Sequence, residues 1–199
     1  AGVVSLLVGG VLALLVTLTR WPAVKLLPPD WFYLALTAHG FDVLLAWIIF
    51  FEMAVLYFAS AILLNSRIAA PRWGWAQFWL MLVGALMTNV AVLQGNSSVM
   101  FTSYPPLLAA PHFYLGLVLF AVGALIGCAV FFGTLVVARD EKTYQGSVPL
   151  VTFGAIVAWF LNDAGLPLIA AAILAVVISG AFGWAQDVGF WRPLRRRGS

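Results

Sequence analysis

The chain has 199 residues, of which 64% are hydrophobic and only 9% are charged. Soluble domains usually carry about 25% charged residues, so this composition excludes a water-soluble globular protein. The formal net charge of +3 comes largely from a basic tail at 192–197, so no nucleic-acid partner is expected. The single cysteine, Cys128, lies in an apolar run, which excludes a disulfide framework and a cysteine-based metal site.

Apolar runs predict the membrane-spanning segments, because about 20 apolar residues in a helix cross the hydrocarbon layer. The predicted spans, in one transmembrane helical domain over 1–199, are 1–19, 41–64, 75–93, 113–137, 149–161 and 168–184. Asp163, Gly165 and Pro167 separate the last two runs, so a single long kinked helix is the alternative there. The predicted fold class is an all-α integral membrane protein, a polytopic bundle of five to six transmembrane helices.

Charges in the connecting segments predict the orientation. Arg67 and Arg72 follow the second span. Arg139 and Lys142 follow the fourth. Loops on the cytoplasmic side are enriched in Lys and Arg, so both segments and the N-terminus are expected on that side. With six spans the tail at 192–197 falls on the same side, which favours six spans over five.

His39 begins the second predicted span, in the order Ala38-His39-Gly40. Ionisable side chains at membrane depth are costly and mark functional sites. An imidazole nitrogen can ligate haem iron, and Gly40 would let a flat macrocycle approach the backbone. The alternative, which composition alone favours, is an interfacial histidine that forms a hydrogen bond with a neighbouring helix.

Two carboxylates follow His39 on the same predicted helix. Asp42 lies three residues later, on nearly the same face, where it would orient a partner or line a water path. Glu52 lies thirteen residues after His39, roughly 20 Å along the helix and about 220° around it, so the two do not share a face. A proton relay and a protonated carboxyl hydrogen-bonded between helices both remain open for Glu52.

His112 is the second histidine and opens the fourth span, in Pro111-His112-Phe113. Two histidines at one depth on two helices would clamp one b-type haem. The alternative is a histidine that serves only the start of the helix or the membrane interface. The remaining residues assemble no nucleophile, phosphate-binding loop, carboxylate pair or Cys/His metal cluster.

Three stretches resemble one family in their order and spacing. They are Thr37-Ala38-His39-Gly40, Tyr104-Pro105-Pro106-Leu107 with Phe113-Tyr114-Leu115-Gly116 shortly after it, and Val148-Pro149-Leu150-Val151-Thr152. This order resembles helices I to V of subunit I of the haem-copper terminal oxidases, most closely the B-type branch. The resemblance covers residues 1–160, and after Leu161 the sequence departs from the family pattern.

The resemblance implies a role for His39 as an axial ligand of a low-spin haem of b or a type. It implies that Tyr104 shapes a loop on the haem side of the bundle, and it transfers no ligand role to His112. The family's copper and high-spin haem ligands lie on later helices and have no counterpart here. Copper is therefore not expected to bind this chain, and the chain alone is not expected to reduce oxygen.

The expected function is that of a component of a respiratory haem-copper oxidase, similar to cytochrome c oxidase. It would contribute a low-spin haem ligand to electron transfer toward oxygen and be incomplete without a second polypeptide. The expected partners are the lipid bilayer, other membrane subunits including a chain with the remaining histidines, and cytochrome c or another electron donor, in a bacterial or archaeal cytoplasmic membrane. The alternatives are a noncatalytic accessory or scaffold subunit, and a small b-type cytochrome that uses His39 and His112.

Overall fold

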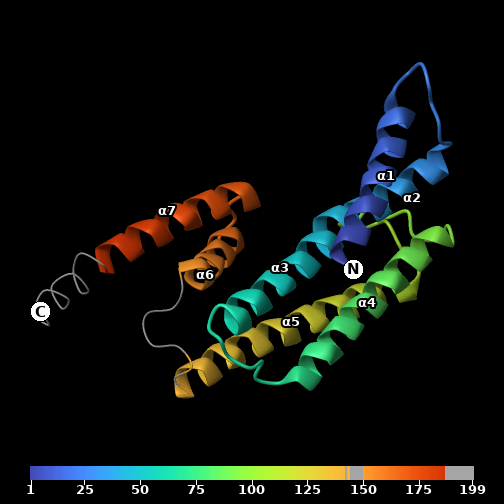
Figure 1. Cartoon of the computed structure of the whole chain (residues 1–199). Helices are drawn as coiled ribbons and strands as arrows, with labels where there is room; N and C mark the ends of the chain where they lie inside the picture. Colours follow the sequence, from blue (N-terminus) through green and yellow to red (C-terminus); the bar gives the residue numbers. More distant parts are fainter. Residues whose placement is uncertain (142, 144–149, 187–199) are drawn as a thin grey trace, which may run out of the picture. The chain divides into compact units, whose positions relative to one another are not determined.

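A computed structural model of the chain describes residues 1–141, 143 and 150–186 (Figure 1). Every secondary-structure element in this part of the chain is helical, which confirms the predicted all-α class. The elements are α1 (Gly2–Arg20), α2 (Pro29–Phe41), η1 (Asp42–Trp47), α3 (Ile48–Tyr57), η2 (Phe58–Ile62), α4 (Pro71–Leu93), α5 (Pro111–Asp140), α6 (Leu150–Asp163) and α7 (Leu168–Gln186). Elements α2 to η2 form one continuous helix of 34 residues, in which η1 and η2 are π-helical turns.

Four helices in the described residues are long and apolar enough to cross a membrane. They are Gly2–Arg20, Pro29–Ile62, Pro71–Leu93 and Pro111–Asp140. They correspond to the first four predicted spans.

The second helix begins at Pro29, twelve residues before the predicted span that starts at residue 41. Pro29 occupies the first turn, where its fixed φ suits a helix, and Asp30 beside it complements the positive end of the helix dipole. At 1.5 Å per residue the helix is about 51 Å long, which exceeds the roughly 30 Å hydrocarbon layer, so the apolar run marks only part of it. His39 therefore lies well inside the helix and not at its start.

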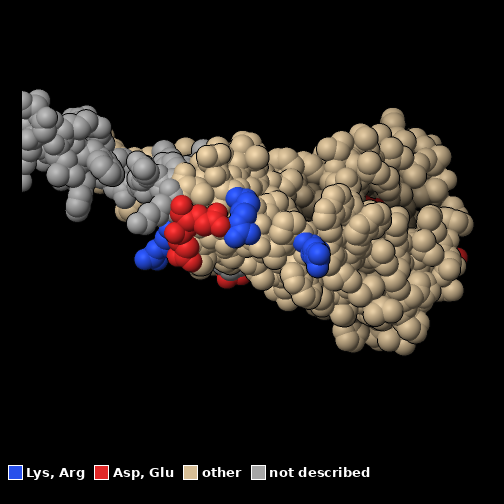
Figure 2. Space-filling model, turned by 60° about the horizontal axis from the view of Figure 1, so that its bottom comes forward, with Lys and Arg blue, Asp and Glu red and all other residues tan. Residues whose placement is uncertain are grey.

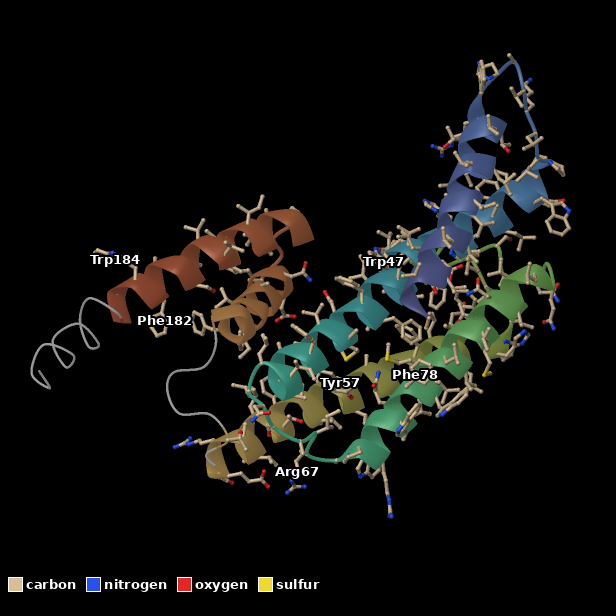
Figure 3. All side chains as sticks on the ribbon, in the orientation of Figure 1. Trp47, Tyr57, Arg67, Phe78, Phe182 and Trp184 are labelled. Carbon is tan, nitrogen blue, oxygen red and sulfur yellow. The ribbon has the colours of Figure 1, made fainter. Side chains whose placement is uncertain are left out.

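Helices α6 and α7 form a hairpin, so the alternative of one long kinked helix is wrong. The chain reverses at Gly165, whose φ of +92° favours glycine, and Leu166 N donates to Leu161 O at 3.1 Å to close the end of α6. Figure 3 labels Phe182 of α7, which stacks on Phe153 of α6 with ring centroids 4.8 Å apart. With 14 residues, about 21 Å long, α6 is shorter than a full span, and the crossing of α6 and α7 remains a prediction.

The chain divides into two compact units, described separately below: Ala1–Ala54 with Ala70–Phe132, and Val55–Ala69 with Gly133–Ser199. In the first unit, α4 and α5 approach through glycines. A Cβ placed on Gly84 would lie 2.5 Å from the carbonyl oxygen of Gly116, so no larger residue fits without moving a backbone. Phe120 of α5 meets Phe41 and Phe50 edge to face, with centroids 5.9 and 5.6 Å apart, which fixes α2 and α3 on this pair.

In the second unit, polar contacts join Val55–Ala69 to the end of α5. Arg67 pairs with Glu141 at 2.9 Å, and Ala69 N donates to Thr134 Oγ1 at 3.1 Å. On the face shown in Figure 2 most of the surface is uncharged, as suits helices that lipid surrounds. Lys142, the stretch 144–149 and the basic tail at 192–197 lie outside the described residues.

Candidate functional site

The site is built where α1 packs against α2 and η1 in the first unit. Gly9 makes the approach possible, because a Cβ there would lie 2.5 Å from Val43 Cγ2 and 3.3 Å from Asp42 Cβ. Small residues at such crossings let two helix backbones come close inside a membrane. The backbone of α1 is thereby brought within reach of the side chains on the turn that carries His39.

His39 Nδ1 lies 2.9 Å from the carbonyl oxygen of Gly9. A carbonyl oxygen can only accept, so Nδ1 carries the proton and donates this hydrogen bond. The other ring nitrogen, Nε2, then holds the lone pair that a metal ion needs. The contact matches the predicted bond to a neighbouring helix, and it leaves His39 in the tautomer of a ligand.

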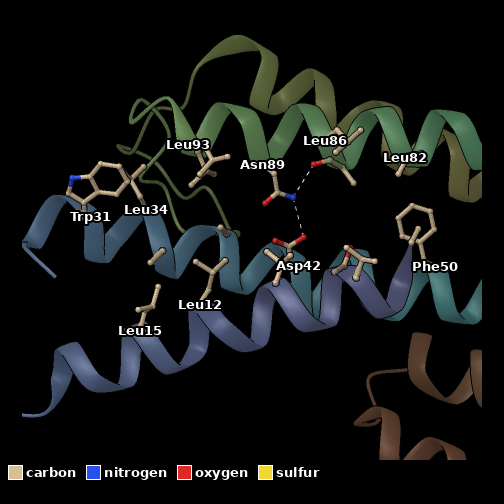
Figure 4. A pocket seen from close by; sticks show the side chains of 18 of the residues that line it. Leu12, Leu15, Trp31, Leu34, Asp42, Phe50, Leu82, Leu86, Asn89 and Leu93 are labelled. Carbon is tan, nitrogen blue, oxygen red and sulfur yellow. Dashed lines mark hydrogen bonds between the residues drawn. The ribbon is translucent and has the colours of Figure 1, made fainter. Parts of the chain in front are cut away.

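Asp42 is buried, with 2% of its surface exposed, one turn after His39. Asn89 of α4 donates from Nδ2 to Asp42 Oδ1 at 3.1 Å and to the carbonyl oxygen of Ala85 at 3.1 Å (Figure 4). Asp42 thus pairs with Asn89, a residue that the sequence analysis did not single out. An amide in the apolar run of α4 was the available signal, because membrane helices use such residues to bond across an interface.

A cavity of about 540 Å³ opens beside this pair, between α1, α2 and α4 (Figure 4). Its walls are apolar apart from Asp42, Asn89 and Ser5. His39 is not among the residues that line it, so the histidine and the cavity are two separate features of the same helix crossing. Glu52 does not line it either, and its predicted position on a different helical face from His39 remains a prediction.

The loop from Gln94 to Ala110 covers the helix next to His39. Met100 N donates to Thr37 Oγ1 at 2.8 Å, and the Phe101 ring lies on Gly40, where a Cβ would be 2.9 Å from Phe101 Cδ1. The small size of Gly40 therefore admits Phe101, whereas the sequence analysis assigned this space to a macrocycle. Tyr104 is 68% exposed in the same loop, and its predicted haem-side role remains a prediction.

His112 is the second residue of α5, and its Nε2 is buried without a hydrogen-bond partner among the described residues. The predicted clamp of one haem between His39 and His112 remains a prediction. No group of three or more His, Cys, Asp or Glu side chains lies together in the described part of the chain. The Nδ1 bond leaves the lone pair of His39 Nε2 for a metal ion, as an axial haem ligand requires, and the role of His39 as that ligand remains a prediction.

Comparison with known proteins gives independent evidence of the family to which the chain belongs. The family model described as "Cytochrome C and Quinol oxidase polypeptide I" matches residues 1–194. Cytochrome c oxidase subunit 1 of Thermus thermophilus is 30% identical over 176 residues, covering 84% of this chain and 30% of that protein. An uncharacterized protein of Aquifex aeolicus is 30% identical over 130 residues, covering 65% of this chain and 31% of that protein.

A solved structure is also similar, the one described as "Cryo-EM structure of a heme-copper terminal oxidase dimer provides insights into its catalytic mechanism". It superimposes with a TM-score of 0.66 at 25% identity, over 80% of this chain and 28% of the other. The helices found here therefore follow the arrangement in that protein. The chain spans about a third of the length of the curated relatives it matches.

Proposed function

The chain belongs to the cytochrome c and quinol oxidase polypeptide I family, that of subunit I of the haem-copper oxidases, and on that premise we propose that His39 is an axial ligand of a low-spin haem. When bound, the haem supplies one-electron transfer. The observation that carries the proposal is the bond from His39 Nδ1 to the Gly9 carbonyl oxygen at 2.9 Å, which leaves Nε2 free for iron.

The residues around His39 would hold the ring in place. The Gly9 carbonyl sets the tautomer and orients the imidazole plane, because a second hydrogen bond fixes both in histidine ligands. The Asp42–Asn89 bond ties the next helical turn to α4. In this proposal the chain binds the haem and orients the His39 imidazole. A second polypeptide supplies the other groups: the second axial ligand, the high-spin haem ligand and the copper-binding histidines.

The assembly would lie in a bacterial or archaeal cytoplasmic membrane with the N-terminus of this chain on the cytoplasmic side. Its other partners would be further membrane subunits and cytochrome c or another electron donor. Electrons would pass through the low-spin haem toward an oxygen-reducing centre. The similarity to Thermus thermophilus cytochrome c oxidase subunit 1 supports this assignment.

The test is an optical spectrum with quantitative haem extraction on the detergent-purified native assembly, with mass spectrometry of the chains that co-purify. His39→Ala is expected to remove the low-spin haem, and His39→Gly is expected to regain its spectrum when imidazole is added. His112→Ala is the matched control, with the other histidine of the chain removed, and it should keep the haem. A haem-free wild-type assembly would leave a noncatalytic scaffold and overturn the proposal.

The same measurement distinguishes the oxidase proposal from the alternative, a small b-type cytochrome. The buried Nε2 of His112, unpartnered among the described residues, is the observation that keeps this second candidate in view. If the haem requires both His39 and His112 and no histidine-rich partner co-purifies, the two-histidine clamp replaces the oxidase proposal.

A further inference from the structure

Glu52 is a carboxylate in the membrane-spanning part of the first unit. It lies on the continuous helix Pro29–Ile62, about 15 Å from the end at Ile62, which places it inside the hydrocarbon layer. It is half-buried, and among the described residues it has no hydrogen-bond or ion-pair partner. Its oxygens do not belong to the buried polar atoms that lack a partner, so the carboxyl group has accessible surface. A group from outside these residues can therefore reach it.

The helices of this chain bring no countercharge to the depth of Glu52. Neither Lys nor Arg occurs in the apolar parts of the described helices, which are 2–19, 31–62, 74–93, 112–138 and 150–186. A carboxylate in hydrocarbon is costly, and intramembrane ionisable residues pair with one another or face a polar cavity. Because Glu52 does not line the cavity beside Asp42, the cation that would balance it comes from outside the described residues.

The surface beside Glu52 lets another helix come close. The next residue, Met53, packs on α5, where a Cβ on Gly127 would lie 2.5 Å from Met53 Sδ. Cys128, which follows Gly127, is the neighbour of Glu52 across this helix contact. Ala124 lies one turn before Cys128 on the same face of α5, and both are half-buried. Small residues four apart on a membrane helix allow the close approach of a second helix.

The length of the chain indicates where such a helix would come from. This chain spans about a third of the curated relatives it matches, and in the proposed function a second polypeptide supplies the remaining groups. Resting on that function, we propose that a transmembrane helix of the second polypeptide packs against α3 and α5 beside Cys128 and pairs a Lys or Arg side chain with Glu52. A cation balances the carboxylate, whereas a hydroxyl or an amide would leave its charge in the hydrocarbon, and a lipid tail offers neither donor nor charge.

The first test measures how much of the second polypeptide stays bound. The native assembly is purified through an affinity tag on this chain, and mass spectrometry quantifies the chains that co-purify. Glu52→Gln keeps the size of the side chain and removes its charge, so the amount of partner per chain should fall at least about tenfold. Asp30→Asn is the matched control, an exposed carboxylate at the start of the same continuous helix, and it should change nothing.

The second test locates the partner residue. Phe132 lies one turn after Cys128 and is 47% exposed, so Phe132→p-benzoylphenylalanine places a photoreactive group on this face. Irradiation of the native assembly is expected to attach a peptide of the second polypeptide in which a Lys or Arg interrupts an apolar run. Glu52→Gln should lower the yield at least about tenfold. Glu52→Lys, combined with replacement of that partner cation by Glu, should restore both the yield and the bound partner.

An unchanged amount of partner in Glu52→Gln would overturn the proposal, since a neutral donor or lipid would then be the neighbour of Glu52. A crosslink to residues of this chain would also overturn it. If haem and second polypeptide are both present and Glu52→Gln alters neither, the contact is refuted and the role of His39 stands. A wild-type assembly without a second polypeptide would refute the contact and the proposed function together. Circular dichroism identifies a variant that fails to fold, and the crosslink obtained with Glu52 unchanged then decides.

Discussion

The two compact units of this chain are held together in different ways. In the first, the helices meet through glycines, the half-buried amide of Asn89 and the buried carboxylate of Asp42. In the second, the hairpin of α6 and α7 keeps large apolar side chains exposed, among them Val176 at 72% and Ile173 at 62%. The first unit exposes apolar side chains as well, such as Leu93 at 74%, so both surfaces suit lipid, and the difference lies in the closer glycine contacts of the first unit. The residues with candidate chemistry, His39 and Asp42, both lie in the first.

The largest effect is expected when one glycine in each unit is replaced by alanine, which tests whether the helices of the two units pack differently. Gly84→Ala places a methyl group 2.5 Å from the backbone oxygen of Gly116, which can yield only if a helix moves, and should cost about 3 kcal/mol. Gly180→Ala in α7 meets nothing within 4 Å and should stabilise by about 0.5–1 kcal/mol, because alanine favours helix more than glycine. Thermal unfolding of both variants in detergent is measured by circular dichroism, and thiol labelling of Cys128 reports the unfolding of the first unit. Equal effects of both changes would refute the difference between the units.

The next largest effect is expected at the buried polar pair. Asn89→Leu leaves both oxygens of Asp42 without a donor among the described residues and should cost about 1.5–3 kcal/mol, the range for a hydrogen bond to a charged group. The double change Asp42→Leu with Asn89→Leu removes the need for the bond and should be less destabilising than Asn89→Leu alone. The same unfolding assay measures both. A double variant that is less stable than either single variant would contradict this account.

Gly9→Ala tests the support of His39. Its methyl group would lie 2.5 Å from Val43 Cγ2, so α1 shifts away from η1 at a cost of about 1–2 kcal/mol, and the bond to His39 Nδ1 lengthens. The low-spin haem spectrum should shift and its content fall. Gly10→Ala is the matched control, since a methyl group there meets nothing within 4 Å. Identical haem spectra in the two variants would show that the Gly9 carbonyl does not position the histidine.

The smallest effect is expected at the ion pair of the second unit. Arg67 and Glu141 are 67% and 40% exposed, and exposed pairs contribute about 0.2–1 kcal/mol. Arg67→Ala should therefore change the unfolding temperature little, and high salt should remove what difference there is. A loss as large as that of Asn89→Leu would mean that the second unit depends on its polar contacts as strongly as the first.

The ends of the predicted and observed helices differ where a helix extends beyond its apolar run, because hydropathy marks only the apolar residues. Apolar runs located α1, α4 and α5 to within four residues at each end, because burial in lipid requires a continuous apolar length. The same measure missed the start of the second helix at Pro29, since a helix continues past the hydrocarbon layer wherever its residues permit it. It also left the last two runs undecided, which the reversal at Gly165 separates into two helices.

The sequence by itself determined the membrane class, the positions of four long helices and the candidate ligand His39, because these depend on local composition and on the chemistry of one side chain. The tertiary structure alone decided which residues meet. Gly9 lies 30 residues from His39, and Asn89 lies 47 from Asp42. Such pairings depend on how each helix is rotated about its axis and how closely its neighbour approaches, and neither quantity is a property of a single segment.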